Sequence, residues 1–361
     1  MSYYELFIHS FNVQIILVLF AILLLSSYAF SRRNNLPPGP WRLPLLGNLP
    51  TLALNLYRTG KEPEQLFADI AKKYGEVFSL KFGTKLVVIV NGFESIKDIS
   101  KDPRVNDRPR STLMEEIELD VATLFSSGKS WKFQRTFMLK TFRAFGVGRI
   151  KFEGNVIKEA ATLVNAGTES PTSTLRWALL YMMKYPEIQA KVHQEIDAVV
   201  GPTRMPQWAD RSLLPYTEAV LLEIQRIRTN LATSFPRVAS EDTKLAGYDI
   251  PKGTFVIFNH WAVHNDPDVW AEPEQFKPER FVDDDGKLLH REELMPFSKG
   301  HRQCLGENLA KMEFFLFFTY ILHSFTITKP SDAKAPSMKG ISGVSLSPTP
   351  FQIVLTERKK N

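Results

Sequence analysis

The chain of 361 residues contains only one cysteine, Cys304. A single thiol cannot form an internal disulfide, and it cannot supply the several thiolates of a zinc knuckle or an iron–sulfur cluster. This scarcity of cysteine favours a reducing environment that faces the cytosol. One thiolate can still be the only protein ligand of a haem iron, so Cys304 stays a candidate metal ligand.

Charge of one sign is not concentrated anywhere in the sequence. The net charge is +6, and the basic residues are dispersed. No segment is similar to a nucleic-acid-binding module, so we expect no nucleic-acid partner. A mild positive excess agrees with solubility alone, with an anionic membrane surface or with an acidic protein partner.

Apolar runs of bilayer length are limited to one, Val13 to Phe30. With the two residues before it, this run reaches about 20 residues, the length that spans a bilayer core. The alternative is a cleaved signal peptide, but the preceding residues include Glu5 and neither lysine nor arginine, and no small-x-small cleavage site follows. Arg32 and Arg33 follow directly, and the positive-inside rule places them in the cytoplasm. We therefore expect a single-pass signal anchor over residues 1–35.

Residues 36–361 are expected to form one domain that is mainly α-helical with small β-sheets, an α+β arrangement. It begins with a stiff proline-rich spacer, Leu36 to Pro40. Periodicity predicts helices at 62–74, 93–99 and 188–199 and a buried core helix at 313–325. Alternation and turn residues predict hairpins at 77–90, 247–257 and 344–356.

The residues around Cys304 suit a metal-bound thiolate. Gly300 and Gly306 allow tight backbone conformations and a close approach to a flat ring. Arg302 places a cation nearby. The segment from Leu305 to Phe325 reads as a helix, so the thiol would lie at a helix N-terminus, which favours the thiolate. The alternative is a small buried core residue, the usual role of a free cysteine.

The pattern Phe297-x-x-Gly300-x-Arg302-x-Cys304-x-Gly306 resembles the haem-binding loop of the cytochromes P450. The resemblance implies haem b as the cofactor, with Cys304 as the iron ligand. It also implies that the other four residues of the pattern are cofactor-binding residues. The resemblance extends over nearly all of residues 36–358 and is closest to the microsomal animal class that oxidises drugs, fatty acids and other lipophiles.

Trp131 and Arg135 are four residues apart and share one face of a helix. On local grounds this is an ordinary amphipathic helix. Beside a haem loop, the pair resembles the Trp-x-x-x-Arg of the family, whose side chains donate hydrogen bonds to a haem propionate. The same resemblance implies three further propionate partners, Arg108, Arg237 and Arg302.

The segment Ala166 to Ser170 resembles the oxygen-activation motif of the long distal helix in this family. The resemblance implies that Glu169 and Ser170 are catalytic residues that deliver protons, and that Gly167 leaves room for dioxygen. A serine stands where the family usually has threonine, and Pro171 would kink the helix. The alternative is a loop or a helix start, because Ser-Pro suits a helix N-terminus.

An internal stretch of the family pattern is absent. The segment that resembles the family up to Val164 directly adjoins the motif at Ala166. The missing part is on the order of a hundred residues or more, enough for several average helices. It would include the helices that roof the substrate pocket and the first half of the distal helix. A splice variant, an exon-skipping gene model and a decayed copy would each produce it.

Two further pairs of residues have regular spacing. Glu223 and Arg226 are three apart on a predicted helix, and the resemblance implies that they form a buried structural triad with Arg280. His260 and His264 are four apart. No third metal ligand is evident near them, and their spacing also fits a surface helix turn.

The resemblance implies a haem-thiolate monooxygenase that inserts one oxygen atom of dioxygen into xenobiotics, fatty acids or steroids. Electrons would come from NADPH through the membrane-bound NADPH–cytochrome P450 reductase, with cytochrome b5 as a second candidate partner. The domain would face the cytoplasm on the endoplasmic reticulum membrane. One alternative is a truncated, haem-binding membrane protein without coupled turnover. Another is a thiolate-haem isomerase or dehydratase, which needs neither dioxygen nor a reductase.

Overall fold

The computed structural model describes residues 13–16, 18–22, 35–109, 124–144, 153–343 and 345–358. The predicted anchor falls for the most part outside these ranges. Its described parts, 13–16 and 18–22, are helical and exposed. Within the described ranges, no helix is both long enough and apolar enough to span a bilayer.

One mixed four-stranded sheet has the strand order β1-β2-β6-β3. Strands β1 (Val77–Phe82) and β2 (Lys85–Val90) form the predicted antiparallel hairpin, which turns at Gly83 with φ 61°. Strand β6 (Phe255–Phe258) lies parallel to β2, and β3 (Arg237–Val238) pairs with β6 in the antiparallel sense. The end of β2 is fully buried because packed clusters cover both faces of the sheet, which explains its continuous apolar run.

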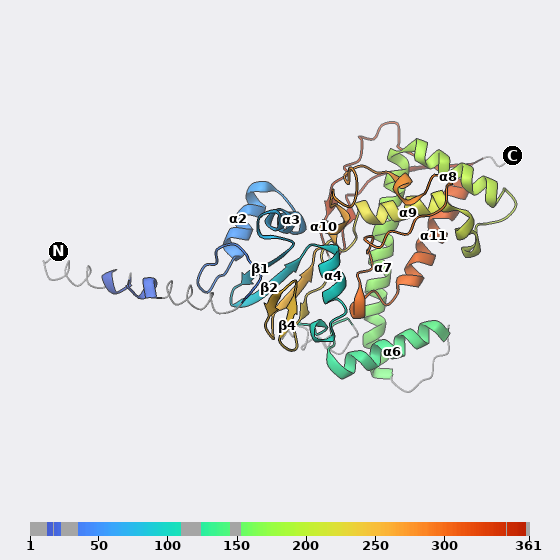
Figure 1. The fold of residues 1–361 in the computed structure, drawn as a ribbon. Coiled ribbons are helices and arrows are strands. Elements are labelled where there is room, and N and C mark those ends of the chain that lie inside the picture. The colour runs from blue at the N-terminus through green and yellow to red at the C-terminus, as the bar shows by residue number, and fades with distance from the viewer. Residues whose placement is uncertain are drawn as a thin grey trace.

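Short helices cover this sheet (Figure 1). Helices α2 (Leu49–Thr59) and α3 (Pro63–Tyr74) contribute to the cluster on one face, and α4 (Phe93–Ile99) contributes to the cluster on the other. Helix α3 begins with a capping box between Glu62 and Gln65, has proline at its first position and ends at Gly75. These local signals explain why the prediction at 62–74 is confirmed.

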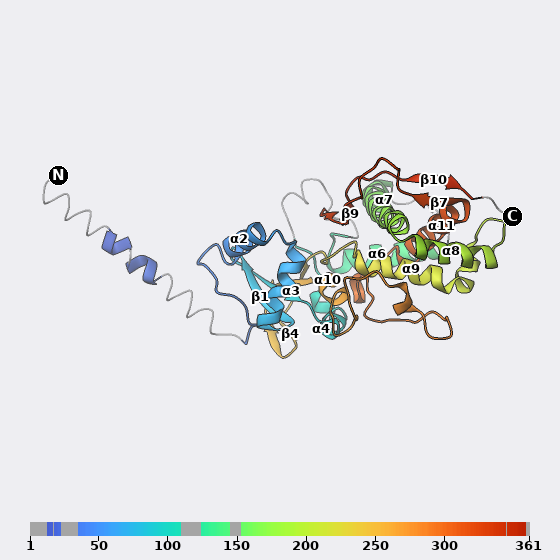
Figure 2. The ribbon, with the colours of Figure 1, turned by 90° about the horizontal axis from the view of Figure 1, so that it is seen from above.

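The longer helices form a second body beside the sheet (Figures 1 and 2). Its core comes from α7 (Glu153–Lys184), α8 (Pro186–Val199), α9 (Pro215–Ile227) and α11 (Glu307–Ser324), and includes Trp177, Ile224 and Phe315. Helix α6 (Gly128–Ala144) precedes them in the chain. The described part is mainly α-helical with small sheets, as the sequence predicts.

The remaining elements are short. The short helices are η1 (Pro103–Val105), η3 (Trp208–Leu213), α10 (His260–His264), η4 (Pro278–Phe281) and η5 (Gly300–Arg302). The two-stranded sheets pair β4 (Thr243–Leu245) with β5 (Tyr248–Ile250), β7 (Phe325–Thr328) with β10 (Val354–Glu357), and β8 (Gly340–Ile341) with β9 (Ser347–Pro348).

Two of the three predicted hairpins are wrong. Residues 247–257 do not pair with themselves, because β5 turns back at Ala246 and Gly247, both with positive φ, to pair with β4. Strand β6 then joins the main sheet. Residues 344–356 also form no hairpin, since β9 and β10 each pair with a strand from before this segment. Local alternation identifies strands but does not identify their partners.

Candidate haem site

The loop that contains Cys304 folds back on itself before α11. The backbone N–H of Cys304 donates to the carbonyl oxygen of Phe297 at 2.9 Å, and that of Gln303 donates to Gly300 at 3.0 Å. Helix α11 begins at Glu307 with Gly306 as its N-cap. The predicted start at residue 305 is therefore too early, and Cys304 lies just ahead of the helix.

The thiol does not have the lowered pKa that a helix N-terminus predicts. Desolvation raises the pKa of the Cys304 thiol, and the charge of Glu307 adds to this rise, although the residue is exposed at the surface of the described protein. A hydrogen bond from the backbone of Gly306 and the charge of Arg135 act in the opposite direction. The alternative of a small buried core residue is wrong, because Cys304 is exposed.

The two glycines of the loop differ in their surroundings. Gly300 has φ 75°, and a Cβ there would lie 2.1 Å from the carbonyl oxygen of Ser100, at the end of α4. Gly306 has φ −92°, and nothing described lies within 4 Å of a Cβ at that position. Gly300 thus allows the loop to approach α4, whereas the described protein gives no reason for a glycine at 306.

These surroundings predict that alanine at position 300 destabilises the protein and that alanine at position 306 does not. Gly300→Ala should lower the free energy of unfolding by at least about 1–2 kcal/mol, the cost of a left-handed non-glycine residue, before the clash with Ser100 is added. Gly306→Ala should leave the free energy of unfolding of the haem-free protein unchanged. Denaturant titration of both variants is the measurement, and equal stabilities would contradict this account of the loop.

Helix α6 contacts the loop through the face that the sequence predicts. Arg135 donates to the carbonyl oxygen of Gln303 at 2.9 Å. The guanidinium of Arg302 lies 4.1 Å from the centre of the Trp131 ring, and it also donates to the carbonyl oxygens of Asn106 and Ser126. Trp131 and Arg135, one turn apart, therefore both lie against the cysteine loop.

Arg108 and Arg237 approach from the segments next to the sheet. Arg108 donates to the carbonyl oxygens of Leu124, Phe235 and Pro236 at 2.8–3.0 Å. Arg237, in β3, donates to the carbonyl oxygen of Lys299 at 3.2 Å, and its guanidinium lies 4.3 Å from the ring centre of Phe258. The structure therefore brings the predicted cofactor-binding residues together around the cysteine loop. They are Arg108, Trp131, Arg135, Arg237, Phe297, Gly300, Arg302, Cys304 and Gly306.

Four arginines concentrate positive charge in this region. Burial lowers the pKa of Arg108 to about 10, of Arg237 to about 9 and of Arg302 to about 8, and it also lowers the pKa of Arg135. Mutual repulsion among the four lowers the pKa values of Arg237 and Arg302 further. Among the described residues, no carboxylate contributes to the pKa shifts of Arg108, Arg135 or Arg237. Because a guanidinium stays protonated in proteins, the region favours a bound anion.

Two buried donors in this region have no described hydrogen-bond partner. They are the indole Nε1 of Trp131 and one terminal nitrogen of Arg237. An unsatisfied buried donor costs about 1–3 kcal/mol, so it points to an absent acceptor. The two propionates of haem are carboxylates that fit both the unpaired donors and the positive charge. The residues present therefore fit the predicted cofactor.

The predicted catalytic pair lies on α7, a continuous helix of 32 residues that includes Pro171. The alternative of a loop or helix start at this point is therefore wrong. The hydroxyl of Ser170 donates to the carbonyl oxygen of Ala166, and the carboxylate of Glu169 accepts from the hydroxyl of Ser345 at 2.7 Å. Glu169 is exposed, and no contact between this pair and the cysteine loop occurs among the described residues.

Sequence reasoning did not predict the contacts by which Ser345 and His260 support these segments. Ser345 holds Glu169, and His260 contacts the hydroxyl of Ser298 in the cysteine loop at 3.2 Å. His260 and His264 are both buried, so the idea of a surface helix turn is wrong. His264 contacts the hydroxyl of Thr229 and accepts from the backbone of Met295. Burial lowers the pKa of both histidines, and the described residues contain no cluster of three metal-ligating side chains.

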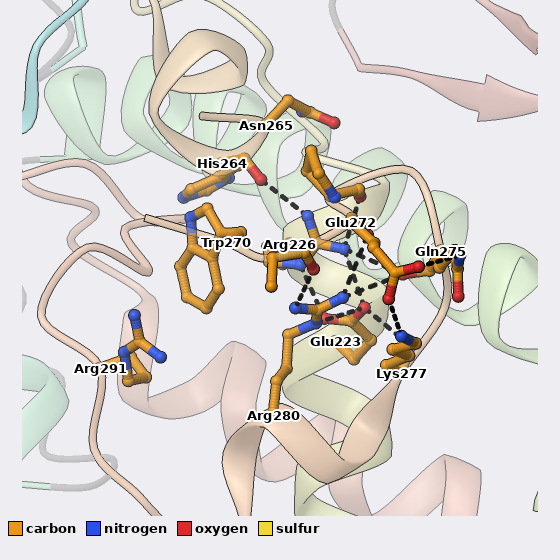
Figure 3. Close-up of polar contacts among 12 residues, drawn as sticks. Glu223, Arg226, His264, Asn265, Trp270, Glu272, Gln275, Lys277, Arg280 and Arg291 are labelled. Carbon is orange, nitrogen blue, oxygen red and sulfur yellow. Dashed lines mark hydrogen bonds and ion pairs between the residues drawn. The ribbon is translucent and has the colours of Figure 1, made fainter. Parts of the chain in front are cut away.

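The predicted structural triad is confirmed (Figure 3). Arg226 makes two hydrogen bonds to the carboxylate of Glu223, at 2.7 and 2.8 Å, and Arg280 donates to the same carboxylate at 3.1 Å. Glu223 and Arg226 are completely buried. The remaining donors of Arg226 bond the carbonyl oxygens of His264 and Pro273. The triad thus connects α9 to the segment that leads toward the cysteine loop.

Comparison with known proteins identifies the family. The family model described as cytochrome P450 matches residues 37–165 and 153–355. The chain belongs to the cytochrome P450 family. It is similar to cytochrome P450 2U1 of Homo sapiens, with 28% identity over 91% of this chain and 90% of the relative. It is 31% identical to cytochrome P450 2J1 of Oryctolagus cuniculus, over 91% of this chain and 92% of the relative. It is 30% identical to cytochrome P450 2J2 of Homo sapiens, over 92% of this chain and 94% of the relative. The chain is therefore like the animal cytochromes P450 of family 2, and its mixture of helices and small sheets fits this fold.

The lengths of the alignments bear on the expected absence of an internal stretch. The alignment with cytochrome P450 2U1 extends over 490 positions, whereas this P450 has 361 residues, so at least 129 positions (490 − 361) lie opposite gaps in this chain. The family model matches in two pieces, which overlap at residues 153–165, at the start of α7.

Proposed function

We propose that this P450 is a haem-thiolate monooxygenase of lipophilic substrates, with residues 36–361 as its haem domain. The observation that carries the proposal is the set of buried arginines beside Cys304, together with the unpaired donors on Trp131 and Arg237. Family membership supports a haem monooxygenase of the family 2 type. When bound, the haem would supply the iron chemistry that activates dioxygen.

Each residue near the cysteine loop has a defined role in the proposal. Cys304 would be the iron ligand. Trp131 and Arg237 would donate to the propionates through the atoms that lack described partners, while Arg108, Arg135 and Arg302 would neutralise their charge. Gly306 leaves space for the ring. Phe297 and Gly300 maintain the loop conformation through their backbone contacts.

We also propose that Glu169 and Ser170 hold and move the protons that the reaction consumes. The carboxylate of Glu169 can receive protons from solvent because the residue is exposed. Ser345 orients this carboxylate through its hydrogen bond. The hydroxyl of Ser170 must leave the carbonyl of Ala166 in order to donate elsewhere.

The proposal includes partners and a location. Electrons would come from NADPH through NADPH–cytochrome P450 reductase, and cytochrome b5 is a second candidate donor. The substrates would be xenobiotics, fatty acids or steroids. The protein would lie on the endoplasmic reticulum membrane with its domain in the cytoplasm, held by the apolar run at residues 13–30.

The second candidate function is a haem-binding membrane protein without coupled turnover. The observation that favours it is the gap of at least 129 positions opposite the relatives. If the absent stretch lies near residues 164–166, inside α7, it removes the family's helices that roof the pocket and exclude water from it. Catalysis of this kind depends on a site from which water is excluded, so bound oxygen would be lost as peroxide or superoxide.

Coupling of electrons to product separates the two functions. The purified protein would be reconstituted with reductase and vesicles, and NADPH consumption would be compared with product and peroxide formed from a panel of lipophilic substrates. The monooxygenase proposal predicts product in proportion to the NADPH consumed. Consumption that yields only peroxide would contradict it and support the second candidate. Glu169→Gln should increase the peroxide share if Glu169 delivers protons.

A further inference from the structure

The cysteine loop has two residues with positive φ before Cys304, and only one of them is a glycine. Gly300 has φ 75°, which glycine adopts without steric cost. Ser298 has φ 62°, a left-handed conformation that is strained for a residue with a Cβ. Strain of this kind persists only where the surrounding structure holds the residue in place. The loop therefore requires a contact that holds Ser298.

His260 makes this contact. Its Nε2 lies 3.2 Å from the hydroxyl oxygen of Ser298, and its Nδ1 lies 3.1 Å from the carbonyl oxygen of Leu231. Burial and the charge of Arg237 lower the pKa of His260 to about 4, so the ring is neutral at neutral pH. A carbonyl oxygen only accepts, so Nδ1 carries the ring hydrogen. Nε2 is then the acceptor, and the hydroxyl of Ser298 donates to it.

The main sheet fixes His260 on its other side. His260 begins α10 directly after β6, and only 2% of its surface is exposed. The residue between them, Asn259, is the N-cap of α10 and is completely buried. Its amide donates to the carbonyl oxygen of Glu64 and to the side-chain oxygen of Asn91, both at 2.8 Å. The imidazole thus has a rigid base from which it can hold the loop.

Ser298 lies within the backbone that supports Cys304. The residue before it, Phe297, provides the carbonyl oxygen that accepts from the backbone N–H of Cys304 at 2.9 Å. The residue after it, Lys299, provides the carbonyl oxygen that accepts from Arg237 at 3.2 Å. A change of φ at Ser298 would turn these two carbonyl groups relative to each other. The imidazole contact therefore affects the position of the thiol without touching it.

We propose that His260 is a positioning residue for the iron ligand. Its acceptor nitrogen holds the hydroxyl of Ser298, which keeps Ser298 left-handed and keeps the carbonyl of Phe297 aligned with the backbone N–H of Cys304. The role toward iron rests on the proposed function, but the contact itself is present in the haem-free protein. The proposal also explains why a serine and not a glycine has a left-handed φ here, because glycine has no hydroxyl for His260 to hold.

Amide hydrogen exchange at Cys304 tests this contact in the haem-free full chain. Because the chain has one cysteine, isotope-labelled cysteine gives a single backbone amide signal in a nuclear magnetic resonance spectrum. His260→Phe keeps a planar ring and removes the acceptor, so exchange should accelerate about two- to tenfold, the effect of losing one neutral hydrogen bond. His260→Gln, whose side-chain oxygen can accept from Ser298, should restore slow exchange. Unchanged exchange in His260→Phe would overturn the proposal.

Substitutions of Ser298 distinguish this contact from a general effect on stability. Ser298→Ala removes the hydroxyl but keeps the strained backbone, so it should accelerate exchange at Cys304, and adding His260→Phe should accelerate it no further. Ser298→Gly also removes the strain and should exchange more slowly than Ser298→Ala. The indole N–H of Trp177, which donates to Leu346 at 2.8 Å in the helical body, is the internal control. Equal acceleration at Trp177, or faster exchange in Ser298→Gly than in Ser298→Ala, would contradict the proposal.

The haem-loaded protein tests the role of His260 toward iron. The red-shifted band of the reduced carbon monoxide spectrum should decay faster in His260→Phe and Ser298→Ala than in the unchanged protein, and His260→Gln should retain it. A band that is equally stable in all variants, despite faster exchange at Cys304, would contradict this role. Absence of the band from the unchanged protein would contradict the proposed function and the role toward iron together, while the exchange data would still decide whether His260 holds the loop.

Discussion

Glu223→Ala is expected to lower the free energy of unfolding by about 3–5 kcal/mol, the usual cost of removing one partner of a buried ion pair. The carboxylate is completely buried and accepts from Arg226, Arg280 and the backbone of Lys277. Without it, two guanidinium groups would stay in the interior with carbonyl oxygens alone to balance them (Figure 3). The effect should exceed that of most single substitutions.

Denaturant unfolding measures this prediction, and an exposed carboxylate supplies the control. Glu279 forms an ion pair with Lys191, and both side chains are about half exposed. Glu279→Ala should change the free energy of unfolding by no more than about 1 kcal/mol. If Glu223→Ala is no more destabilising than Glu279→Ala, the buried triad does not stabilise the haem-loop side of the core.

Arg237→Met is expected to accelerate haem loss without destabilising the haem-free protein. Methionine retains an apolar stem against Phe258 and removes a guanidinium whose pKa is lowered to about 9 by burial and by the neighbouring arginines. A buried hydrogen bond to a charged group contributes about 1.5–3 kcal/mol, so haem retention should weaken about ten- to a hundredfold. The haem-free protein loses a buried, repelled charge and should become equally stable or more stable.

Transfer of haem to an excess of an acceptor apoprotein measures the first half of this prediction, and denaturant titration of the haem-free protein measures the second. Trp131→Phe is a companion variant, because it removes the unpaired indole N–H and keeps an aromatic ring beneath Arg302. Arg204→Met, which breaks the ion pair of an exposed arginine with the buried Asp210, should leave haem transfer unchanged. A faster loss of haem accompanied by an equal loss of stability in the haem-free protein would indicate that Arg237 is only structural.

Sequence reasoning located correctly the elements whose caps, turns or residue spacings lie within a few residues of the element itself. The capping box and the terminal glycine bound α3, the turn at Gly83 fixes the β1–β2 hairpin, and the spacing of Glu223 and Arg226 places both charges on one helix face. In the candidate site, Trp131 and Arg135 lie against the cysteine loop, as a shared helix face predicts.

The failures involve interactions between distant parts of the chain. Strand β6 alternates as a hairpin arm would, but it pairs with β2, which is far away in sequence. The two histidines at 260 and 264 have the spacing of a surface turn, yet packing from other segments buries them. The pKa of Cys304 depends on desolvation and on the charge of Arg135 as well as on the nearest helix end. Local patterns do not contain this information.

The measurement that tests the account most directly is the carbon monoxide difference spectrum of the reduced, haem-loaded protein, compared with that of Cys304→Ser. The account predicts the red-shifted band of a thiolate-ligated haem in the unchanged protein. It also predicts the loss of that band when the sulfur is replaced by oxygen, even where haem is retained through the arginines. A red-shifted band that survives the substitution, or its absence from the unchanged protein with haem bound, would contradict Cys304 as the iron ligand.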